Sequence, residues 1–350
     1  MQLLNQTINL IGSLDEKAME EALKKQNCLT KPKGSLGVLE DLAIQAAGIT
    51  GKVWPEIGDK VIITMAADHG VVAEGVSAYP QEVTLQMLNN FVQGGAAINV
   101  LARHVGARVL VVDIGVAAAV ELKGVLNKKI RWGTDNLAKG PAMSRSEAIA
   151  AVEAGIAVVN NEVGRGARVI GTGDMGIGNT TSSSTILAAF SSLPAEKIVG
   201  RGTGVDDGSW LRKIRAVYEA LAVNRPDPRD ALDVLAKVGG LEIGGLAGCI
   251  LGAAARRVPV IIDGFISGAA ALIAAQIEPK TRQFMIASHL SAEPGHRFVL
   301  DLLGLEPILK MNLCLGEGTG AALVMSLLDA SLKIGSEMAT FESAGVSGKK

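Results

Sequence analysis

The sequence predicts an α/β protein built around one parallel β-sheet of six strands. Six short apolar runs, rich in β-branched residues, are separated by longer segments whose apolar residues recur at helical spacing. Such alternation is typical of βα units, in which helices connect parallel strands. The predicted strands span residues 60–65, 108–113, 167–170, 258–262, 284–286 and 308–315.

The end of each predicted strand is polar or glycine-rich, which indicates a single crevice. Examples are Asp68-His69-Gly70, Asp263-Gly264 and Ser288-His289, which follow the first, fourth and fifth strands. In open parallel sheets, ligands bind beyond the carboxyl ends of the strands. We therefore expect one site there, lined by several carboxylates.

Helix signals fill the segments between the strands. Residues 13–16 and 144–147 both match a capping box, so each predicts a helix start. A core-facing helix is expected over residues 82–103, continuing past the glycine pair at 94–95. The apolar segment 243–255 is shorter than the roughly 18 residues that a membrane span needs, so a buried helix is expected.

Composition excludes several classes of protein. The 34 basic and 35 acidic residues give a net charge of −1, and only 3% of residues are aromatic, which argues against a nucleic-acid partner. No secretion signal precedes the first predicted helix. The three cysteines are far apart and odd in number, which predicts neither disulfides nor a metal site and fits a reducing cytoplasm.

Two acidic residues lie inside glycine-rich turns at strand ends. Glu317 stands among Gly316, Gly318 and Gly320, before an apolar run at helical spacing, and Asp174 lies in the turn after the third strand. A carboxylate in an apolar pocket has a raised pKa and can accept a proton near neutral pH. The alternative is helix capping by either acid. The helix start after Glu317 also offers backbone N–H groups that suit an anion.

The motif Gly171-x-Gly173-x-x-Gly176 matches the dinucleotide fingerprint and follows a strand. That fingerprint expects an acidic residue at the end of the next strand, whereas Glu196 precedes the next apolar residues. The motif also comes late in the chain. An NAD-dependent oxidoreductase is therefore only the alternative prediction.

The same glycines suit a phosphate monoester. Two glycine-rich segments, 173–178 and 200–204, precede helical patterns, so their N–H groups could hold an anion. Arg212 and Lys213 follow the second segment within about two helical turns. The alternative is a pair of ordinary turns with solvated charges.

Other charged groups allow two interpretations. Lys31 and Lys33 lie in a loop that is either solvated or close to an anionic ligand. His69 beside Asp68 is either a structural pair or a catalytic one. The spacing of His69, His289 and His296 does not predict a metal site.

Two motifs resemble signatures of the nicotinate-nucleotide:dimethylbenzimidazole phosphoribosyltransferase family. They are Gly173-Asp174-Met175-Gly176-Ile177-Gly178-Asn179-Thr180-Thr181 and Leu315-Gly316-Glu317-Gly318-Thr319-Gly320. Supporting matches follow in order at residues 31–37, 67–70, 79–84, 263–266 and 288–296, so the resemblance spans about residues 30 to 330.

The resemblance implies a Rossmann-like, three-layer parallel sheet and a small helical domain drawn from the chain ends. The helical domain would comprise residues 1–30 and 331–350, and the catalytic domain residues 31–330. It further implies a homodimer, no metal and no redox cofactor. Membrane association and nucleic-acid binding are not expected.

The reaction of the family moves phosphoribose from nicotinate mononucleotide to a ring nitrogen of 5,6-dimethylbenzimidazole, with inversion. The product, α-ribazole 5′-phosphate, supplies the lower ligand of cobalamin. By resemblance, Glu317 removes the N–H proton of the acceptor, and Asp174 helps to polarise or orient the base. The pyridinium leaving group needs no acid, so positioning the two substrates supplies much of the remaining rate.

The resemblance also assigns residues to the two substrates. Gly316 belongs to the substrate site next to Glu317. The donor phosphate is expected near Gly176, Gly202, Lys213 and Ser291. The base pocket is expected to be walled by Tyr79, Gln86, Met175 and Leu315.

One position departs from the family pattern, which usually has Glu where this sequence has Asp174. A side chain shorter by one methylene weakens turnover or leaves room for another acceptor. Some relatives use phenolic acceptors and work as a pair of paralogous chains. A phenolic or purine acceptor and a paralogous partner therefore stay open as alternatives.

Overall fold

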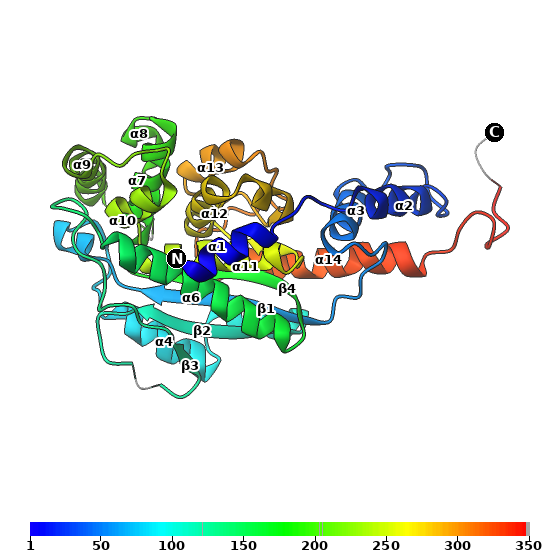
Figure 1. Cartoon of the computed structure of the whole chain (residues 1–350), viewed down its shortest axis with the longest axis horizontal. Coiled ribbons are helices and arrows are strands. Elements are labelled where there is room, and N and C mark those ends of the chain that lie inside the picture. Colours follow the sequence, from blue (N-terminus) through cyan, green and yellow to red (C-terminus); the bar gives the residue numbers. More distant parts are fainter. Residues whose placement is uncertain (121, 203, 205, 348–350) are drawn as a thin grey trace.

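The computed structural model describes residues 1–120, 122–202, 204 and 206–347, and its centre is a six-stranded parallel sheet (Figure 1). The strand order is β3-β2-β1-β4-β5-β6, which is the order of the Rossmann fold. The strands are β1 (Asp59–Ala67), β2 (Ala107–Gly115), β3 (Val125–Asn127), β4 (Ala167–Met175), β5 (Val260–Ile262) and β6 (Met285–Ala287). The predicted α/β class and the parallel sheet are confirmed.

One strand was assigned to the wrong segment. Residues 308–315 form no strand; a single parallel bridge joins Leu309 to His289. Asn312 has a φ of +56°, which breaks the pleat, and most of the segment is exposed. The sixth strand is instead β3, which has only three residues and pairs with β2 at the sheet edge.

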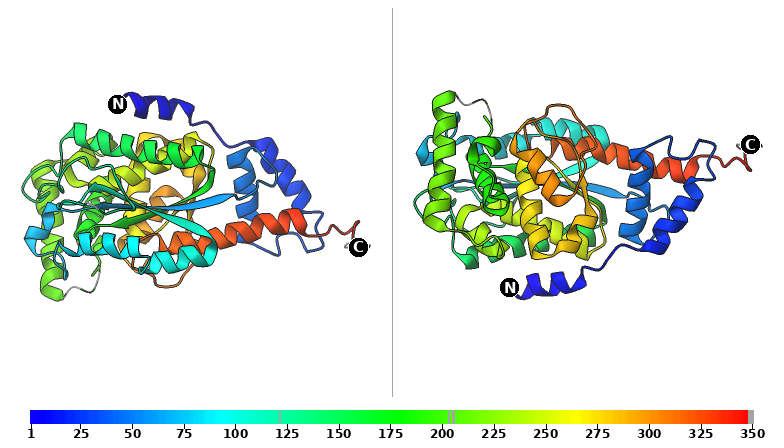
Figure 2. Two further views of the ribbon diagram at one scale, coloured as in Figure 1. Left: turned by 90° about the horizontal axis from the view of Figure 1, so that it is seen from below. Right: turned by 90° about the horizontal axis from the view of Figure 1, so that it is seen from above.

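Helices cover both faces of the sheet, as Figure 2 (left) shows. One face carries α6 (Arg145–Gly164) and α11 (Leu241–Ala255), and the other carries α4 (Val83–Gln93), α5 (Ala97–Val105) and α14 (Thr319–Glu337). The expected burial of segment 243–255 is confirmed, since α11 is buried almost throughout. A Cβ at Gly155 of α6 would lie 1.9 Å from the carbonyl oxygen of Gly245, so these two helices cross in close backbone contact.

Two helix boundaries differ from the prediction. The expected helix 82–103 is two helices, because Gly94 takes a φ of +79° and ends α4 before α5 begins. The first capping box is wrong: Asp15, not Ser13, caps α2 (Glu16–Gln26) by accepting a hydrogen bond from the backbone N–H of Ala18.

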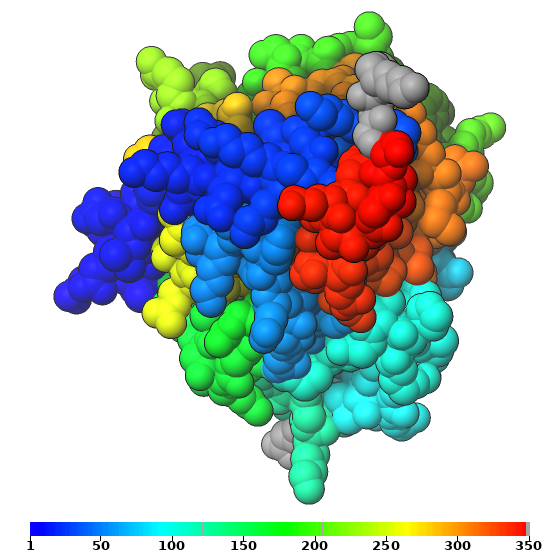
Figure 3. Space-filling model, turned by 90° about the vertical axis from the view of Figure 1, so that its right-hand side faces the viewer, coloured from blue at the N-terminus to red at the C-terminus, as the bar shows by residue number. Residues whose placement is uncertain are grey.

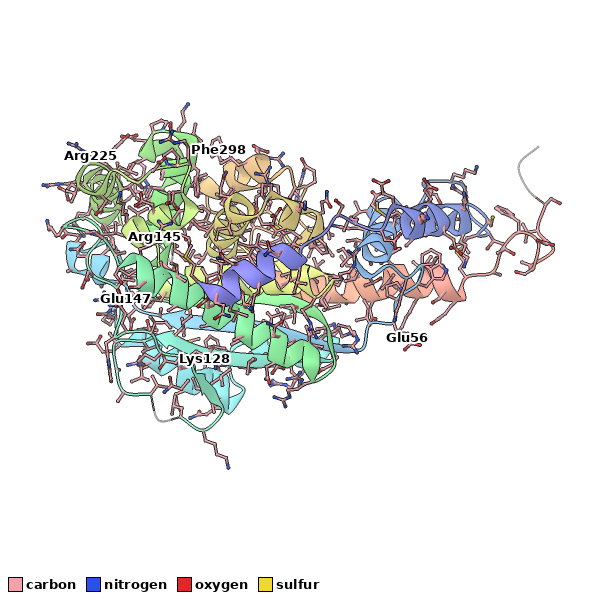
Figure 4. The ribbon with its side chains drawn as sticks, viewed as in Figure 1. Glu56, Lys128, Arg145, Glu147, Arg225 and Phe298 are labelled. Atoms are coloured by element: carbon pink, nitrogen blue, oxygen red, sulfur yellow. The ribbon has the colours of Figure 1, made fainter. Side chains whose placement is uncertain are left out.

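The second capping box is confirmed. Ser144 caps α6, and the carboxylate of Glu147 accepts a hydrogen bond from the Ser144 backbone N–H. Figure 4 labels Arg145 and Glu147 in the first turn of α6. Arg145 forms a salt bridge with Asp230, which itself caps α10 (Ala231–Val238). These contacts fix α6 and α10 beside each other.

A cluster of helices stands beyond the carboxyl half of the sheet (Figure 1). Besides α10 it contains α7 (Asn179–Ser191), α8 (Ala195–Ile198), α9 (Asp207–Asn224), α12 (Phe265–Ile277) and α13 (Gly295–Leu303). Two 3₁₀ helices, Gly70–Glu74 and Pro279–Phe284, follow β1 and precede β6. The loops that enter these helices form the candidate site.

Segments near the two ends of the chain, residues 16–50 and 319–340, pack together at the opposite end of the molecule (Figure 3). There α2 and α3 (Val38–Thr50) pack against α14, and Leu29 pairs with Thr340 in an antiparallel bridge. The first helix, α1 (Gln2–Leu10), lies on α6 and α11 instead.

The division into two domains stays a prediction. Its boundary at residue 330 falls inside the continuous helix α14, and residues 348–350 lie outside the described part of the chain. No helix in that described part is both long and apolar enough to cross a membrane.

Candidate active site

A cavity of about 90 Å³ lies at the carboxyl ends of β4, β5 and β6. It is next to the point where the strand order reverses, between β1 and β4, which is where parallel sheets of this kind bind ligands. The predicted site residues that line it are Asp174, Met175, Gly176, Gly202, Ser291, Leu315 and Gly316. The structure thus brings together residues that are up to 142 positions apart, from 174 to 316.

Glu317 follows the cavity-lining Gly316 in a strained turn, but it does not itself line the cavity. Its φ is +63°, between Gly316 at +81° and Gly318 at +98°. A left-handed conformation costs a non-glycine residue roughly 1 kcal/mol, and such strain concentrates at functional sites. The carbonyl oxygen of Glu317 accepts a hydrogen bond from Thr64 Oγ1 (3.1 Å), which ties the turn to β1.

The carboxylate of Glu317 is buried, with only 5% of the residue exposed. Its Oε2 accepts a hydrogen bond from the backbone N–H of Ile98 (3.2 Å), in the first turn of α5. Burial raises the pKa of Glu317 above its ordinary value, and the Ile98 hydrogen bond opposes this shift. The side chain therefore binds the N-terminus of α5 and does not cap α14, the helix that follows it, and it is also a stronger base than an exposed glutamate.

Asp263 positions this turn, although it was not among the predicted site residues. Its carboxylate accepts hydrogen bonds from the backbone N–H groups of Gly318 (3.2 Å), Gly320 (2.7 Å) and Ala321 (3.0 Å). The strand-end motif Asp263-Gly264 was visible in the sequence. The sequence did not show that the Asp263 carboxylate caps a helix more than 50 residues later in the chain.

One expectation about this turn is therefore wrong. The N–H groups at the start of α14 are not free for an anionic ligand, because the Asp263 carboxylate already accepts their hydrogen bonds. An internal carboxylate has taken the place of an external anion at this helix N-terminus.

Asp174, at the end of β4, is the second buried acid. Its Oδ2 accepts a hydrogen bond from Asn179 Nδ2 (3.0 Å), and its backbone carbonyl accepts one from the N–H of Glu317 (3.3 Å). Burial, with the nearby carboxylates of Asp263 and Glu242, raises the pKa of Asp174 well above its ordinary value. A Cβ at Gly316 would lie 3.1 Å from Asp174 Oδ2, so this glycine leaves room for the acid.

The glycines of the dinucleotide fingerprint serve packing. Gly171 and Gly173 lie inside β4, where a Cβ on Gly171 would meet Ile62 at 2.4 Å and one on Gly173 would meet the Glu317 carbonyl at 2.3 Å. Dinucleotide folds place this motif in the turn after the first strand. The alternative of an NAD-dependent oxidoreductase therefore loses its main support.

A cationic subsite adjoins the cavity beyond Gly176. Lys213, only 1% exposed, donates hydrogen bonds to Thr180 Oγ1 (3.0 Å) and the Gly200 carbonyl (3.1 Å). Its amine and the start of α7 line a small hollow together with Gly202. Burial lowers the pKa of Lys213.

Residues near Lys213 have different surroundings. Arg212 donates to the Gly75 carbonyl and to Ser209 Oγ, and it does not line the hollow around Lys213. Within the predicted loop 200–204, Thr203 lies outside the described residues. Glu293 also lines the cavity; burial raises the pKa of its carboxyl, and the neighbouring Lys213 opposes that shift.

The remaining ambiguous groups are structural. Lys31 forms a buried salt bridge with Glu40 (2.7 Å), among the helices at the other end of the sheet. His69 pairs with Glu242 (2.7 Å) rather than with Asp68, and its other ring nitrogen contacts Ser182 Oγ. This fully buried pair lies beneath the turn at Gly178, whose Cβ would be 3.3 Å from His69 Cβ.

Two predicted base-pocket residues lie apart from the cavity lining. Tyr79 is 49% exposed, and Gln86 is exposed on α4. The other two, Met175 and Leu315, do line the cavity, and Leu315 is 56% exposed at its rim. In the described ranges, no group of three or more His, Cys, Asp or Glu side chains is arranged to hold a metal ion.

Comparison with known proteins assigns this chain to a family. A family model described as phosphoribosyltransferase matches residues 11–346. The chain is 57% identical to the nicotinate-nucleotide–dimethylbenzimidazole phosphoribosyltransferases of Desulforudis audaxviator (strain MP104C) and Chloroflexus aggregans (strain MD-66 / DSM 9485), over 100% of its own length and 99% of theirs. The chain belongs to the nicotinate-nucleotide–dimethylbenzimidazole phosphoribosyltransferase family.

The structure of this family member agrees with that of a solved relative. The crystal structure of the corresponding phosphoribosyltransferase from Thermus thermophilus superposes with a TM-score of 0.91 at 46% identity, covering 96% of this chain and 100% of the other. The predicted Rossmann-like fold and family resemblance are therefore confirmed.

Proposed function

We propose that this phosphoribosyltransferase transfers phosphoribose from nicotinate mononucleotide to 5,6-dimethylbenzimidazole, releasing nicotinate and forming α-ribazole 5′-phosphate for cobalamin. The observation that carries the proposal is the full-length similarity to relatives named for this reaction. The cavity at the carboxyl ends of the strands, with Glu317 following its lining residue Gly316, supports it.

We assign the general base to Glu317. Nicotinate leaves from a pyridinium, so the anomeric carbon becomes electrophilic without a protein acid. The acceptor nitrogen attacks this carbon, and the C–N bond to nicotinate breaks. The N–H proton on the other acceptor nitrogen passes to the Glu317 carboxylate. A pKa raised by burial suits that transfer near neutral pH.

We assign the donor phosphate to the subsite of Gly176, Gly202, Lys213 and Ser291. The buried ammonium of Lys213 supplies positive charge, and the start of α7 supplies the favourable end of a helix dipole. Phosphate held there places the sugar across the cavity toward Asp174 and Glu317.

We assign the acceptor to the side of the cavity formed by Met175, Leu315 and Gly316, with Asp174 orienting the ring. Tyr79 and Gln86 are proposed to approach the acceptor only when it is bound, since both are exposed in this structure. The cavity of about 90 Å³ is smaller than the roughly 300–1,000 Å³ of small-molecule sites, so its wall must open for two substrates. The exposed Leu315 at the rim is the side chain best placed to move.

The deciding experiment is a mass-resolved assay of nicotinate release. Nicotinate mononucleotide is supplied with dimethylbenzimidazole, benzimidazole, adenine, phenol or p-cresol, each separately. An α-ribosyl phosphate product with dimethylbenzimidazole as the best acceptor is the expected result. Preference for phenol, p-cresol or adenine would support the alternative acceptors. Failure with every acceptor would contradict the proposal.

The Asp174→Glu variant in the same assay tests the acceptor assignment. We expect equal or higher turnover of dimethylbenzimidazole, because the longer acid matches the usual family residue. Unchanged rates for every acceptor would mean that position 174 does not set acceptor choice.

The two proposed domains, residues 1–30 with 331–350 and residues 31–330, share α14, so they are expected to melt together.

We propose that the enzyme is a homodimer. Support comes from a hollow of about 1,240 Å³ at the amino ends of the strands, lined by the partly exposed apolar residues Trp54 and Pro55 and by the charged residues Arg168 and Arg256. A second copy that covers this surface would bury it. Light scattering of the purified chain should give twice the monomer mass. A monomer that gains activity only with a paralogous chain would favour the heterodimer.

We also propose a cytoplasmic location. The three cysteines are free in the structure, and Cys28 and Cys314 are exposed, which suits a reducing compartment. Fractionation of cells that produce the protein tests this proposal.

A further inference from the structure

His289 is a cavity-lining side chain to which the proposed mechanism gives no role. It follows β6, only 2% of it is exposed, and its ring lines the cavity with Gly264 and Ser291. A Cβ on Gly320, three residues after Glu317, would lie 2.0 Å from His289 Nδ1. The ring therefore stands between the Glu317 turn and Ser291 of the proposed phosphate subsite.

The hydrogen bonds of Ser288 determine which ring nitrogen carries the proton. Ser288 Oγ donates its single proton to the backbone carbonyl of Asp263 (2.9 Å). The same Oγ lies 3.0 Å from His289 Nδ1, so at this contact it must be the acceptor and Nδ1–H the donor. The neutral ring consequently has a lone pair on Nε2. Burial lowers the pKa of His289 to about 4, which keeps the ring neutral.

The Nε2 edge lies next to Gly264 at the cavity. A Cβ added to Gly264 would lie 3.6 Å from both Cε1 and Nε2, so the missing side chain of this glycine leaves that edge uncovered. Among the described residues, none forms a hydrogen bond with Nε2. The cavity thus presents one uncharged acceptor that lacks a donor.

The neighbouring His296 shows the opposite arrangement. Its Nδ1 accepts a hydrogen bond from the backbone N–H of Ser291 (2.9 Å), so its proton is on Nε2. That Nε2 is enclosed and lies 3.4 Å from a Cβ position on Gly268, inside the helical layer. The two rings lie edge to face, 6.1 Å apart, yet only His289 lines the cavity.

We propose that His289 Nε2 accepts a hydrogen bond from a hydroxyl group of the donor ribose and thereby orients the sugar. The proposal rests on the proposed function. The sugar connects the phosphate to the anomeric carbon, so it must cross the space between Ser291 and the Glu317 turn, where His289 stands. Ribose hydroxyls are the donors that an uncharged acceptor matches. A neutral ring also avoids repelling the positive charge that develops on the sugar as nicotinate leaves.

Two amide variants separate the roles of the two ring nitrogens. His289→Asn keeps a donor near the Nδ1 position, facing Ser288, but does not reach the cavity. His289→Gln extends an amide oxygen to the Nε2 position and keeps an acceptor there. We expect the Kd of nicotinate mononucleotide to rise about tenfold for His289→Asn. The rise for His289→Gln should be smaller, within about threefold.

Donors that lack one sugar hydroxyl give the decisive comparison. Calorimetry measures the Kd of nicotinate mononucleotide and of its 2′-deoxy and 3′-deoxy analogues for the wild type and both variants. For the wild type, the analogue that lacks the recognised hydroxyl should have a Kd about ten times that of the full nucleotide. For His289→Asn, the same analogue and the full nucleotide should have equal Kd values. Melting temperatures of both variants within a few degrees of the wild type confirm that the fold is intact.

Three results would overturn the proposal. One is that His289→Asn binds all donors as the wild type does. Another is that His289→Asn raises the Kd of all three donors by the same factor, which indicates a structural role. The third is that His289→Gln loses as much affinity as His289→Asn. Because binding is measured without an acceptor, these results stay separate from the turnover assay, whose failure would count against the proposed reaction itself.

Discussion

Two glycine-rich turns in this enzyme start from the same sequence signal and end with different chemistry. One precedes α7 and the other precedes α14; their capping residues, Gly178 and Gly318, have φ values of +96° and +98°. At α14 the carboxylate of Asp263 binds the first N–H groups. In the described chain, no carboxylate accepts a hydrogen bond from a backbone N–H at the start of α7, and Lys213 lies beside it.

The difference shows how a helix N-terminus acquires its role. When an internal carboxylate docks on it, the positive end of the helix holds its own turn, and here that turn carries the proposed base Glu317. When no such group docks, the same end stays available for an anion from outside. The glycine pattern alone does not distinguish the two, so the variants below test each turn separately.

The largest effect is expected from Glu317→Gln. The amide oxygen can still accept the hydrogen bond from the Ile98 N–H, so the turn and the start of α5 are kept. Loss of the base should lower kcat by about 10²–10⁴-fold. The Kd of nicotinate mononucleotide should stay within about twofold by calorimetry, since Glu317 makes no contact with the phosphate subsite. An equal loss of binding would instead make Glu317 a structural residue.

Asp263→Asn should damage the α14 turn from within. Its amide nitrogen would face a backbone N–H, such as that of Gly318, and two donors cannot pair. We expect the free energy of unfolding to fall by about 1–3 kcal/mol. We also expect kcat to fall, because Glu317 shifts. Urea denaturation and steady-state kinetics measure both.

The matched control for that variant is Asp15→Asn. Asp15 caps the distant helix α2, so this variant should lose a smaller amount of stability and no activity. Equal kinetic effects in the two variants would refute the positioning role of Asp263.

Lys213→Gln tests the α7 turn. Removing a buried charge that is proposed to contact the donor phosphate should raise the KM for nicotinate mononucleotide about 10- to 100-fold, with a smaller change in kcat. The adjacent Arg212→Gln is the control, because Arg212 contacts Gly75 and Ser209 instead. If both variants raise KM equally, the phosphate does not bind at Lys213.

The smallest effect is a difference between the turns in their dependence on pH. Glu317 must be ionised to accept a proton, so kcat at saturating donor should fall as the pH drops through a pKa that burial has raised above 4.5. Lys213 must be protonated to attract phosphate, so kcat/KM should fall as the pH rises through a pKa that burial has lowered from 10.5. An alkaline limb that persists in Lys213→Gln would assign it to another group.

Features of local origin were predictable from the sequence. The parallel sheet and the buried helix α11 follow from periodicity. Asp174 was expected in a turn after a strand that ends at residue 170, but β4 continues to Met175 and Asp174 lies inside it. The break at Gly94 was also visible as a glycine pair, yet the apolar pattern on both sides outweighed it.

Features that depend on distant partners were not predictable. The three-residue strand β3 is recognisable only by its pairing with β2, and the apolar segment 308–315 lies at the sheet edge without joining it. The capping of α14 by Asp263 and the acceptor tautomer of His289 arise from contacts across the fold. Such contacts leave no local pattern in the chain.

The position of Gly173 has a consequence for protein synthesis. A side chain there would collide with the Glu317 carbonyl, so the base sits directly on the backbone of a strand made some 140 residues earlier. During translation every strand of the sheet is made before Glu317, so the sheet can begin to assemble while the base has not yet emerged from the ribosome. A chain that stops before residue 317 would therefore retain Lys213 but lack both the proposed base and α14, the helix that packs on one face of the sheet.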